Sequence, residues 1–362
     1  MPGEKEISAG RSTFFDDPWQ YYNAILEDMA AASKRIYIET YKYGGDSIGQ
    51  RFRDVLTRKA KEGVEVKVLI DSWGSQVSHS FFKELESYSG EVRFYMKIKF
   101  FWDFFTKNHR RNHRKMILID DTISYVGSSN ISGHSLNWCE SVLRLEDADL
   151  NKQLRKVFLS DYKNYNKYVF SKPGLTRLIR SGSYEIVRDV PSITRQKIKK
   201  RFEDLIKNAR KRIVIETPYF LPGFLLRKAL SDAVKRGVDV TVIIPKYSDV
   251  YMVDLVRGRY LGMLYKNGVN FRMFLPHNLH AKLMLIDGET YSIGSANFDY
   301  RSFRYQMEVV LIGKDNEVVV QLNEHIQNCL NNSEPFNYDE WLKRPFIQRF
   351  FEWLYLPFRH LL

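Results

Sequence analysis

Hydrophobic and polar residues alternate along this chain with two periods, one of three to four residues and one of two. Apolar side chains recur at three- and four-residue steps over residues 21–33, which predicts an amphipathic helix. A β-rich run follows at 34–41, then a helical pattern at 47–62 that Gly63 ends and a strand pattern at 64–70. This β-α-β order predicts parallel strands joined by a right-handed crossover.

The same order of elements returns in the second part of the chain. A helix is predicted over 192–209 and a strand over 211–217, whose first residues KRIVIET nearly repeat the KRIYIET of 34–40. A helical pattern at 225–236 and a strand pattern at 238–244 complete the unit. The repeat predicts an α/β protein made of two duplicated halves, each of ordinary domain size.

A longer motif, H-x-K-x4-D-x6-G-S-x-N, follows each of these units with identical spacing. Its fixed positions are His113, Lys115, Asp120, Gly127, Ser128 and Asn130 in the first copy and His280, Lys282, Asp287, Gly294, Ser295 and Asn297 in the second. The first residues of each copy suit a strand, in which alternation puts the histidine and the lysine on one face. Turn residues at the aspartate predict a hairpin that returns the G-S-x-N segment beside them. Because both aspartates fall at these turns, we expect them to brace the hairpins.

The repeated residue types are suited to phosphodiester chemistry. Such a reaction needs a nucleophile, a proton donor for the leaving oxygen and fixed positive charge on the phosphoryl oxygens. One copy offers one histidine and one lysine, whereas two copies facing each other offer both roles. Each motif is also followed by a carboxylate, Glu140 or Glu308. A carboxylate on Nδ1 would hold the imidazole tautomer that presents Nε2 to phosphorus.

Composition limits the classes of partner and compartment. The net charge of +13 predicts a polyanionic partner, either nucleic acid or an anionic membrane surface. The two cysteines, Cys139 and Cys329, are too few for a disulfide framework or a cysteine-based zinc site, and they fit a reducing compartment. We expect no signal peptide and no transmembrane helix, because neither apolar pattern is present.

The predicted boundaries are a first half at 1–165, a linker at 166–190, a second half at 191–335 and a C-terminal tail at 336–362. The tail combines an aromatic stripe with basic residues, so it either lies in a bilayer interface or docks on the protein core. A run of aromatic and basic residues at 97–111 is open to three interpretations: base stacking, core packing or contact with lipid.

These motifs resemble the phospholipase D superfamily over about residues 21–312, and bacterial cardiolipin synthases of the short type without N-terminal membrane helices in particular. Segments 110–115 (RRNHRK) and 217–222 (TPYFLP) carry the resemblance to this subgroup. The resemblance implies two α/β/α halves related by a pseudo-two-fold axis, with one active site at their junction and no metal or organic cofactor.

The resemblance also implies roles for the motif residues. His113 would form a covalent phosphatidyl-histidine, and His280 would act first as an acid and then as a base. The phosphate would be held by Lys115, Lys282, Asn130 and Asn297, with Ser128 and Ser295 nearby as further substrate-binding residues.

The expected function is that of a cardiolipin synthase-type phosphatidyltransferase, which joins two phosphatidylglycerol molecules, or one and another phospholipid, with release of glycerol. Alternatives are a phospholipase D that forms phosphatidic acid, a phosphodiesterase nuclease and a lipid-binding scaffold. The expected partner is an anionic membrane containing phosphatidylglycerol, with no nucleic acid. We expect a cytoplasmic protein attached to the inner face of the cell membrane, and the sequence leaves its oligomeric state open.

Overall fold

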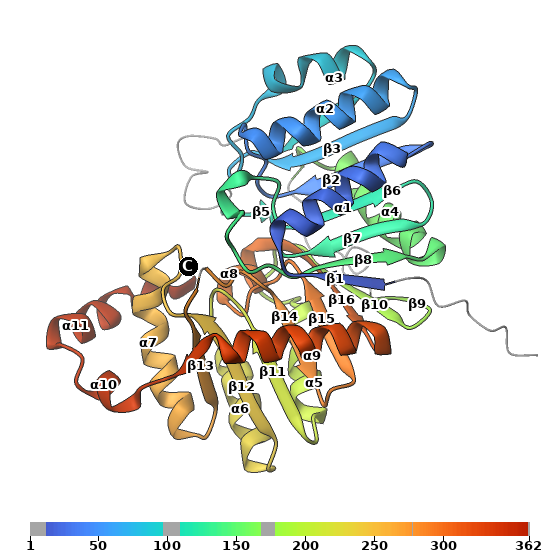
Figure 1. The fold of residues 1–362 in the computed structure, drawn as a ribbon. Helices are drawn as coiled ribbons and strands as arrows, with labels where there is room; N and C mark the ends of the chain where they lie inside the picture. The colour runs from blue at the N-terminus through green and yellow to red at the C-terminus, as the bar shows by residue number, and fades with distance from the viewer. Residues whose placement is uncertain (1–11, 97–108, 168–177, 277, 361–362) are drawn as a thin grey trace, which may run out of the picture.

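The computed structural model describes residues 12–96, 109–167, 178–276 and 278–360 (Figure 1). Most of the aromatic and basic run predicted at 97–111 therefore lies outside the described residues. The described chain forms two mixed sheets that lie one above the other in Figure 1, each with its own helices.

The first half contains a seven-stranded sheet with the order β1-β8-β7-β6-β2-β3-β4. Strands β2, β3 and β4 pair in parallel, and the others pair in an antiparallel way. Its elements, with β5, are β1 (Ser12–Phe15), α1 (Pro18–Ala31), β2 (Arg35–Thr40), α2 (Ser47–Lys61), β3 (Glu65–Asp71), η1 (His79–Phe82), α3 (Lys83–Ser87), β4 (Glu91–Tyr95), β5 (Arg111–Asn112), β6 (Met116–Ile119), β7 (Ile123–Gly127), η2 (Gly133–Ser135), β8 (Val142–Glu146) and α4 (Ala148–Lys163).

The second half contains a sheet with the order β17-β13-β12-β11-β14-β15-β16-β10-β9, to which β5 of the first half adds through β16. The parallel crossover strands are β11, β12 and β13. Its elements are β9 (Ile179–Ser181), β10 (Tyr184–Asp189), α5 (Lys197–Asn208), β11 (Arg212–Glu216), α6 (Phe224–Lys235), β12 (Asp239–Pro245), α7 (Tyr251–Lys266), β13 (Asn270–Phe274), β14 (Leu283–Ile286), β15 (Thr290–Gly294), α8 (Tyr300–Tyr305), β16 (Gln306–Gly313), α9 (Asn316–Asn331) and β17 (Ser333–Pro335).

The duplicated α/β architecture is confirmed, and helix boundaries follow local chemistry. Asp46 caps α2, because its carboxylate accepts hydrogen bonds from the backbone of Ile48 and Gly49, each at 3.1 Å. The helix ends at Gly63 and its counterpart α6 at Gly237, whose φ angles of 87° and 85° favour glycine.

Two sequence predictions need correction here. The helix expected from residue 192 begins only at Lys197, because the Asp189 carboxylate accepts hydrogen bonds from the backbone of Lys197 and Ile198 at 2.8 and 3.0 Å. The linker expected at 166–190 contains strands β9 and β10, and β10 pairs with β16 along five residues. Its alternating residues, with Ile186 facing the core, make this segment part of the second sheet.

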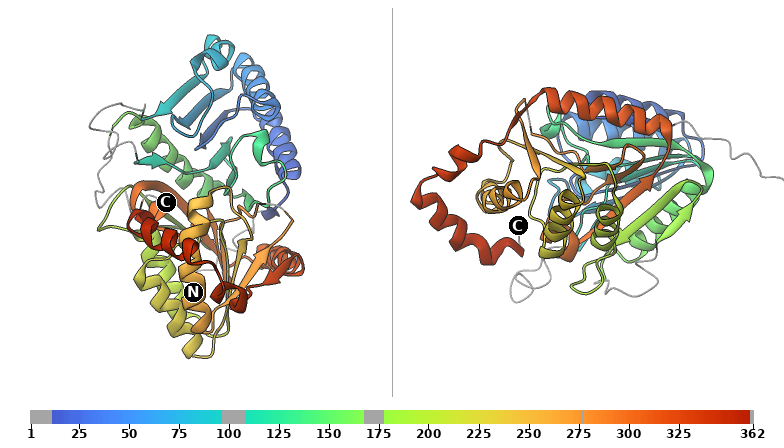
Figure 2. Two further views of the ribbon diagram at one scale, coloured as in Figure 1. Left: turned by 90° about the vertical axis from the view of Figure 1, so that its left-hand side faces the viewer. Right: turned by 90° about the horizontal axis from the view of Figure 1, so that it is seen from below.

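The hydrophobic core has three layers: one on the outer face of each sheet and one between the two sheets. Helices α1 and α2 cover the outer face of the first sheet, and α5 and α6 cover that of the second. Between the sheets lies a shared core to which both inner faces, α4 and α9 contribute. The halves are therefore joined by one continuous apolar layer, with helices on both sides of each sheet (Figure 2).

The tail forms α10 (Tyr338–Leu342), α11 (Phe346–Tyr355) and η3 (Leu356–His360), which lie beside α7 (Figure 1). Trp341 Nε1 donates to the carbonyl of Gly258 at 2.7 Å, and the Trp341 ring lies so close to Gly262 that a Cβ there would clash with it. The Arg344 guanidinium pairs with buried Glu352 at 2.8 Å. The tail thus docks on α7, although most apolar side chains of α11 are exposed.

No helix in the described part of the chain combines the length and the apolar character needed to cross a bilayer.

Candidate active site

The histidine segment of each motif is hydrogen-bonded to the backbone of the other half. Strand β5 pairs in parallel with β16 of the second half, and the backbone N–H of His113 donates to the carbonyl of Met307 at 3.0 Å. In the same way, the N–H of His280 donates to the carbonyl of Cys139 in the first half at 2.7 Å. Each histidine is therefore attached to the segment that carries the carboxylate of the opposite half.

The crossing pairs each imidazole with a buried carboxylate. His113 Nδ1 lies 3.0 Å from Glu308 Oε1, and His280 Nδ1 lies 2.9 Å from both carboxylate oxygens of Glu140. Both carboxylates are fully buried, whereas the two histidines keep small exposed fractions of 7% and 6%. With Nδ1 engaged, Nε2 is the ring atom left for a substrate.

The motif serines lie behind the carboxylates. Ser128 Oγ donates to Glu140 and accepts from the backbone of Ser141 at 2.8 Å. Ser295 Oγ donates to Glu308 and accepts from the backbone of Val309 at 3.0 Å. Both serines are fully buried, so the substrate-binding role expected for them does not fit their position. Their hydroxyls instead hold the carboxylates that contact the histidines.

The lysines lie close to the histidines. Lys282 Nζ is 3.0 Å from His280 Nε2 and 2.8 Å from the His280 carbonyl, and Lys115 Nζ is 2.8 Å from the His113 carbonyl. Both His-x-Lys segments precede the strands expected to contain them, since β6 begins at Met116 and β14 at Leu283. The cause is their hydrogen bonding to the opposite half.

A cavity of about 450 Å³ opens where the halves meet, and its lining includes His113, His280, Asn130 and Asn297. An aromatic ring contacts each histidine edge-on or at a tilt: Tyr41 at His113 and Trp138 at His280, with ring centroids 5.0 and 4.9 Å apart. These rings restrict the orientation of the imidazoles on the cavity side.

Two further polar residues of the lining escaped sequence reasoning. His134 and Arg301 both face the cavity, and each lies four residues after the asparagine of its motif. Comparison of the two copies beyond the G-S-x-N segment would have identified this position. Arg301 adds a cation to the part of the cavity formed by the second half.

Burial governs the charges of the site. It lowers the pKa of His113 well below its usual value, and the lysine ammonium groups act in the same direction. Burial also lowers the pKa of His280, although Glu140 opposes this shift. The pKa of Lys115 falls to about 7 through burial and Lys282. His113 is therefore neutral in the free protein, whereas His280 keeps the contact with Glu140 that favours its protonated form.

The two carboxylates differ. Burial raises the pKa of Glu308 to about 8, in spite of the nearby Lys115 ammonium. Burial acts on Glu140 in the same sense, but the His280 ring and Lys282 outweigh it and lower its pKa. The two halves thus contribute the same residue types to the site, but the pKa of Glu308 is raised and that of Glu140 is lowered.

Asp120 and Asp287 lie at the hairpin turns with φ angles of 50° and 55°. The Asp120 carboxylate accepts hydrogen bonds from the backbone of residues 33–35, and Asp287 does so from residues 210–212. These contacts tie each hairpin to the start of the antiparallel neighbour strand, β2 or β11, away from the cavity.

The fold and the two motifs that meet in one cavity define a protein of the phospholipase D superfamily. The sequence matches the family described as "Cardiolipin synthase, PLD-like domain" over residues 25–162 and 202–330. The chain therefore belongs to the cardiolipin synthase family, a group of phosphatidyltransferases within this superfamily.

Individual relatives agree with this assignment. The chain is 32% identical over 337 residues to the major cardiolipin synthase ClsA of Bacillus subtilis (strain 168), which covers 90% of this chain and 70% of that protein. It is 34% identical over 331 residues to a cardiolipin synthase of Oceanobacillus iheyensis, covering 88% and 68%.

Among solved structures, the phosphatidylserine synthase of Haemophilus influenzae Rd KW20 superposes with a TM-score of 0.75 at 14% identity, over 98% of both chains. A polyphosphate kinase from Porphyromonas gingivalis superposes with a TM-score of 0.63 at 13% identity, over 97% of this chain and 53% of the kinase. At these identities the similarity shows the fold alone.

Proposed function

We propose that the protein transfers a phosphatidyl group from one phosphatidylglycerol to the hydroxyl of a second lipid, forming cardiolipin and releasing glycerol. The observation that carries this proposal is the pair of buried His–Glu contacts at one cavity, each formed across the two halves. Membership of the cardiolipin synthase family supports the choice of lipid substrates.

The geometry supports a two-step reaction. In the first step, His280 is protonated on both ring nitrogens beside the bound anionic phosphate; His113 Nε2 bonds to phosphorus, the bond from phosphorus to the glycerol oxygen breaks, and His280 gives that oxygen its Nε2 proton. In the second step, His280 takes the proton of the acceptor hydroxyl, whose oxygen bonds to phosphorus as the bond to His113 breaks. The histidines return to their starting protonation states.

The asymmetry of the carboxylates supports His113 as the nucleophile. Its low pKa keeps the imidazole neutral, with Nδ1–H directed at Glu308 and a lone pair on Nε2. As phosphorus bonds to Nε2, positive charge develops on the ring, which favours loss of the Glu308 proton, and the resulting carboxylate compensates the charge. His280, beside an ionised Glu140, is suited to gaining and losing a proton.

Lys115 and Lys282 supply positive charge to the phosphoryl oxygens in this proposal. Since phosphate is anionic, it favours the charged amines and raises their pKa values when it binds. Asn130 and Asn297, which line the cavity, can donate amide hydrogens to the same oxygens.

The test is a product assay on vesicles of phosphatidylglycerol, read by mass spectrometry for cardiolipin and glycerol. We expect both products from the wild type and neither from His113→Ala. Phosphatidic acid as the sole lipid product would replace the proposal with a phospholipase D that uses water as acceptor. Cleavage of DNA or RNA that is lost in His113→Ala, with no lipid product, would indicate a nuclease.

The lysines predict how activity depends on pH. The pKa values of Lys115 and Lys282, about 7 and about 8, mean that free protein loses positive charge as pH rises through this range. We expect kcat/KM to fall between pH 7 and 8, whereas the fall in kcat should begin at higher pH because bound phosphate stabilises the ammonium ions.

Steady-state kinetics from pH 6 to pH 10 would measure both profiles. In Lys282→Arg the guanidinium stays charged, so the upper part of the fall in kcat/KM should disappear. A profile that is the same in this variant and in the wild type would exclude Lys282 as its source.

A peripheral attachment to an anionic membrane completes the proposed function. On α11 the apolar side chains Phe346, Phe350 and Trp353 are 78%, 43% and 62% exposed, and they recur at helical spacing. Basic residues of α7 and α11, including Arg259 and Arg349, lie in the groove between these helices. Exposed aromatics next to basic side chains are typical of a helix that lies in a bilayer interface.

The location of α11 supports this attachment. Tyr355 and Leu356 pack on a small core with Tyr219 and Val250, which line the active-site cavity. At the start of α7, Tyr251 adds a side chain that is 73% exposed. Val253 of α7 lines the cavity, and the exposed aromatics lie on α11, which packs beside α7 (Figure 2).

Replacing Phe346, Phe350 and Trp353 together with serine should weaken sedimentation with phosphatidylglycerol vesicles at least about tenfold. The reason is that three aromatic side chains no longer insert into the bilayer interface. The melting temperature should change little, since these side chains are exposed. Val320→Ser, at a 58% exposed position on α9, is the matched control and should leave sedimentation unchanged. Equal sedimentation of the triple variant and wild type would leave core docking as the only role of the tail.

A further inference from the structure

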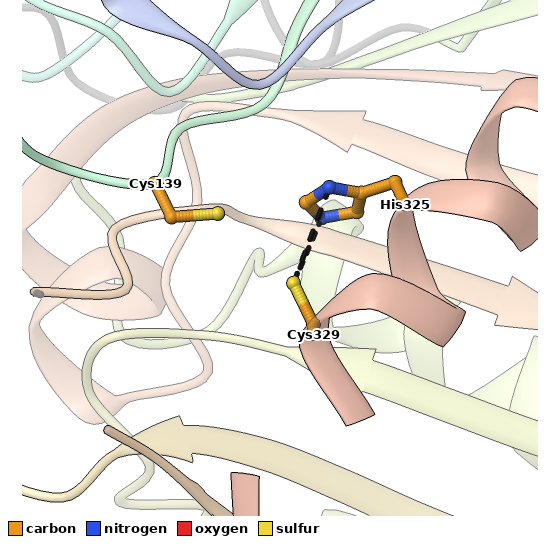
Figure 3. A group of neighbouring side chains, drawn as sticks. All are labelled: Cys139, His325 and Cys329. Atoms are coloured by element: carbon orange, nitrogen blue, oxygen red, sulfur yellow. Dashed lines mark hydrogen bonds between the residues drawn. The ribbon is translucent and has the colours of Figure 1, made fainter. Parts of the chain in front are cut away.

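The two cysteines of the chain, 190 residues apart in sequence, meet beside His325 near the active site (Figure 3). Cys139 belongs to the loop before β8, and His325 and Cys329 lie one turn apart on α9. The sulfur atoms and a ring nitrogen of His325 all lie within 4.8 Å of one another. Two thiols and an imidazole are the ligands that zinc prefers.

A fourth donor lies at the same place. Glu216, the last residue of β11, accepts a hydrogen bond from His325 Nε2 at 2.8 Å through Oε2. Its other oxygen, Oε1, is buried and has no hydrogen-bond partner within the described part of the chain. Its counterpart Glu39 also has one unpartnered oxygen, and at Glu216 this atom is free to serve as a ligand.

The first half has a buried arginine beside the residues that correspond to Glu216 and Cys329. The counterpart of Glu216 is Glu39 at the end of β2, and the counterpart of Cys329 on α4 is Asp161. There the Arg114 guanidinium pairs with Asp161 and supplies a buried positive charge near both carboxylates. The residue equivalent to Arg114 in the second motif is Ala281, which brings no charge.

One distance in the cluster matches that between neighbouring ligands of a tetrahedral site. With Zn–S of about 2.3 Å and Zn–N of about 2.0 Å, neighbouring S and N ligands lie about 3.6 Å apart. Cys329 Sγ lies 3.6 Å from His325 Nε2. The Glu216 oxygen, now 2.8 Å from that nitrogen, needs to move outward by only about 0.5 Å for a metal to replace the shared proton.

The remaining ring nitrogen of His325 already has the partner that zinc-bound histidines have. His325 Nδ1 donates to the carboxylate of Asp16 at 2.7 Å, an arrangement that orients the ring and leaves Nε2 for a metal. Cys329 Sγ lies 3.6 Å from His325 Nε2, and the thiols of Cys139 and Cys329 contact each other.

From these contacts we infer that a structural site for a thiophilic divalent cation, Zn²⁺, is formed by Cys139, Cys329, His325 and Glu216. Binding replaces one proton on the imidazolium and one on each thiol by bonds to the metal. The site is separate from the phosphoryl-transfer cavity and takes no part in bond breaking there.

The cluster adjoins the active site through one residue of the chain. Cys139 directly precedes Glu140, the carboxylate that contacts His280. A metal bound to Cys139 and to two elements of the second half, α9 and β11, would hold this loop across the junction. The cation would thereby position Glu140 relative to His280.

The test is metal analysis of the full chain, purified under reducing conditions, incubated with Zn²⁺ and freed of excess ion by gel filtration. We expect about one zinc per chain in the wild type and less than about a tenth of this in Cys139→Ser and Cys329→Ser. With Co²⁺ in place of Zn²⁺, the wild type should show thiolate-to-cobalt charge-transfer bands, weakened in each single variant. His79→Gln, which removes an exposed His–Glu pair, is the control and should retain full zinc content.

Several outcomes would overturn the inference. One is less than a tenth of an equivalent of zinc and cobalt in reduced wild-type protein. Another is full zinc content in both serine variants, which would place the metal elsewhere. If the serine variants fail to fold, alkylation decides: zinc should protect both cysteines of the native wild type from iodoacetamide, and unchanged labelling would refute the site. A wild type two hydrogens lighter under reducing purification would indicate a disulfide instead.

Discussion

A diester with a nitrophenolate leaving group should give a burst of about one equivalent of nitrophenolate per chain in His280→Ala, and none in His113→Ala. Nitrophenolate departs without a proton, so the bond between His113 Nε2 and phosphorus can form without His280. The second step still needs a base for the acceptor hydroxyl, and steady-state turnover should fall by about 10² to 10⁴. Loss of the nucleophile should cost at least about 10⁴.

Stopped-flow absorbance would measure the burst, and mass spectrometry of the peptide that contains residue 113 would detect the added group. The wild type serves as the reference with steady turnover. A burst in His113→Ala with none in His280→Ala would reverse the two roles. The absence of a burst in both variants, with turnover retained, would rule out a covalent histidine intermediate.

Loss of Glu308 should mimic loss of the nucleophile, although Glu308 lies 195 residues from His113 and follows the other motif. In Glu308→Gln the ring of His113 loses the carboxylate that compensates its charge, so both the burst rate and turnover should fall by about 10² to 10⁴. Glu140→Gln should keep the burst and lose steady-state turnover, because His280 is the catalytic histidine that Glu140 contacts.

The same nitrophenyl substrate would measure both variants, with melting temperature as a check on the fold. Glutamine keeps the size of the buried side chain and an acceptor for Ser128 or Ser295. Glu289→Gln, at an exposed hairpin turn, is the control. A burst that disappears in Glu140→Gln and persists in Glu308→Gln would contradict the crossed pairing.

Much of the fold could be predicted from sequence because the information is local or repeated. The periodic patterns gave β2, α2 and β3 within one or two residues, and duplication of the motif indicated two halves. The segment at 179–189 was missed because its glycine and polar residues resemble a linker, and its strands are stabilised by pairing with β16 far along the chain.

The site could be predicted in part. Spacing predicted that the histidines, lysines and asparagines of the two motifs come together, but which carboxylate contacts which histidine depends on the pairing of β5 with β16, and no local pattern reports it. The family resemblance implied that the serines lie near the substrate. In three dimensions, however, they turn inward to Glu140 and Glu308. The meeting of Cys139 with Cys329 has the same long-range origin.

The pairing of β5 with β16 has a consequence for how the protein is made. A ribosome that has just completed residue 114 must add nearly two hundred more before the partner strand exists, which takes about 10 to 40 s at ordinary elongation rates. During that time Arg114 lacks the Glu308 carbonyl that it contacts in the finished protein. Neither histidine meets its carboxylate until the second half has folded. A nascent or truncated chain therefore has no assembled active site and should be inactive toward phospholipids.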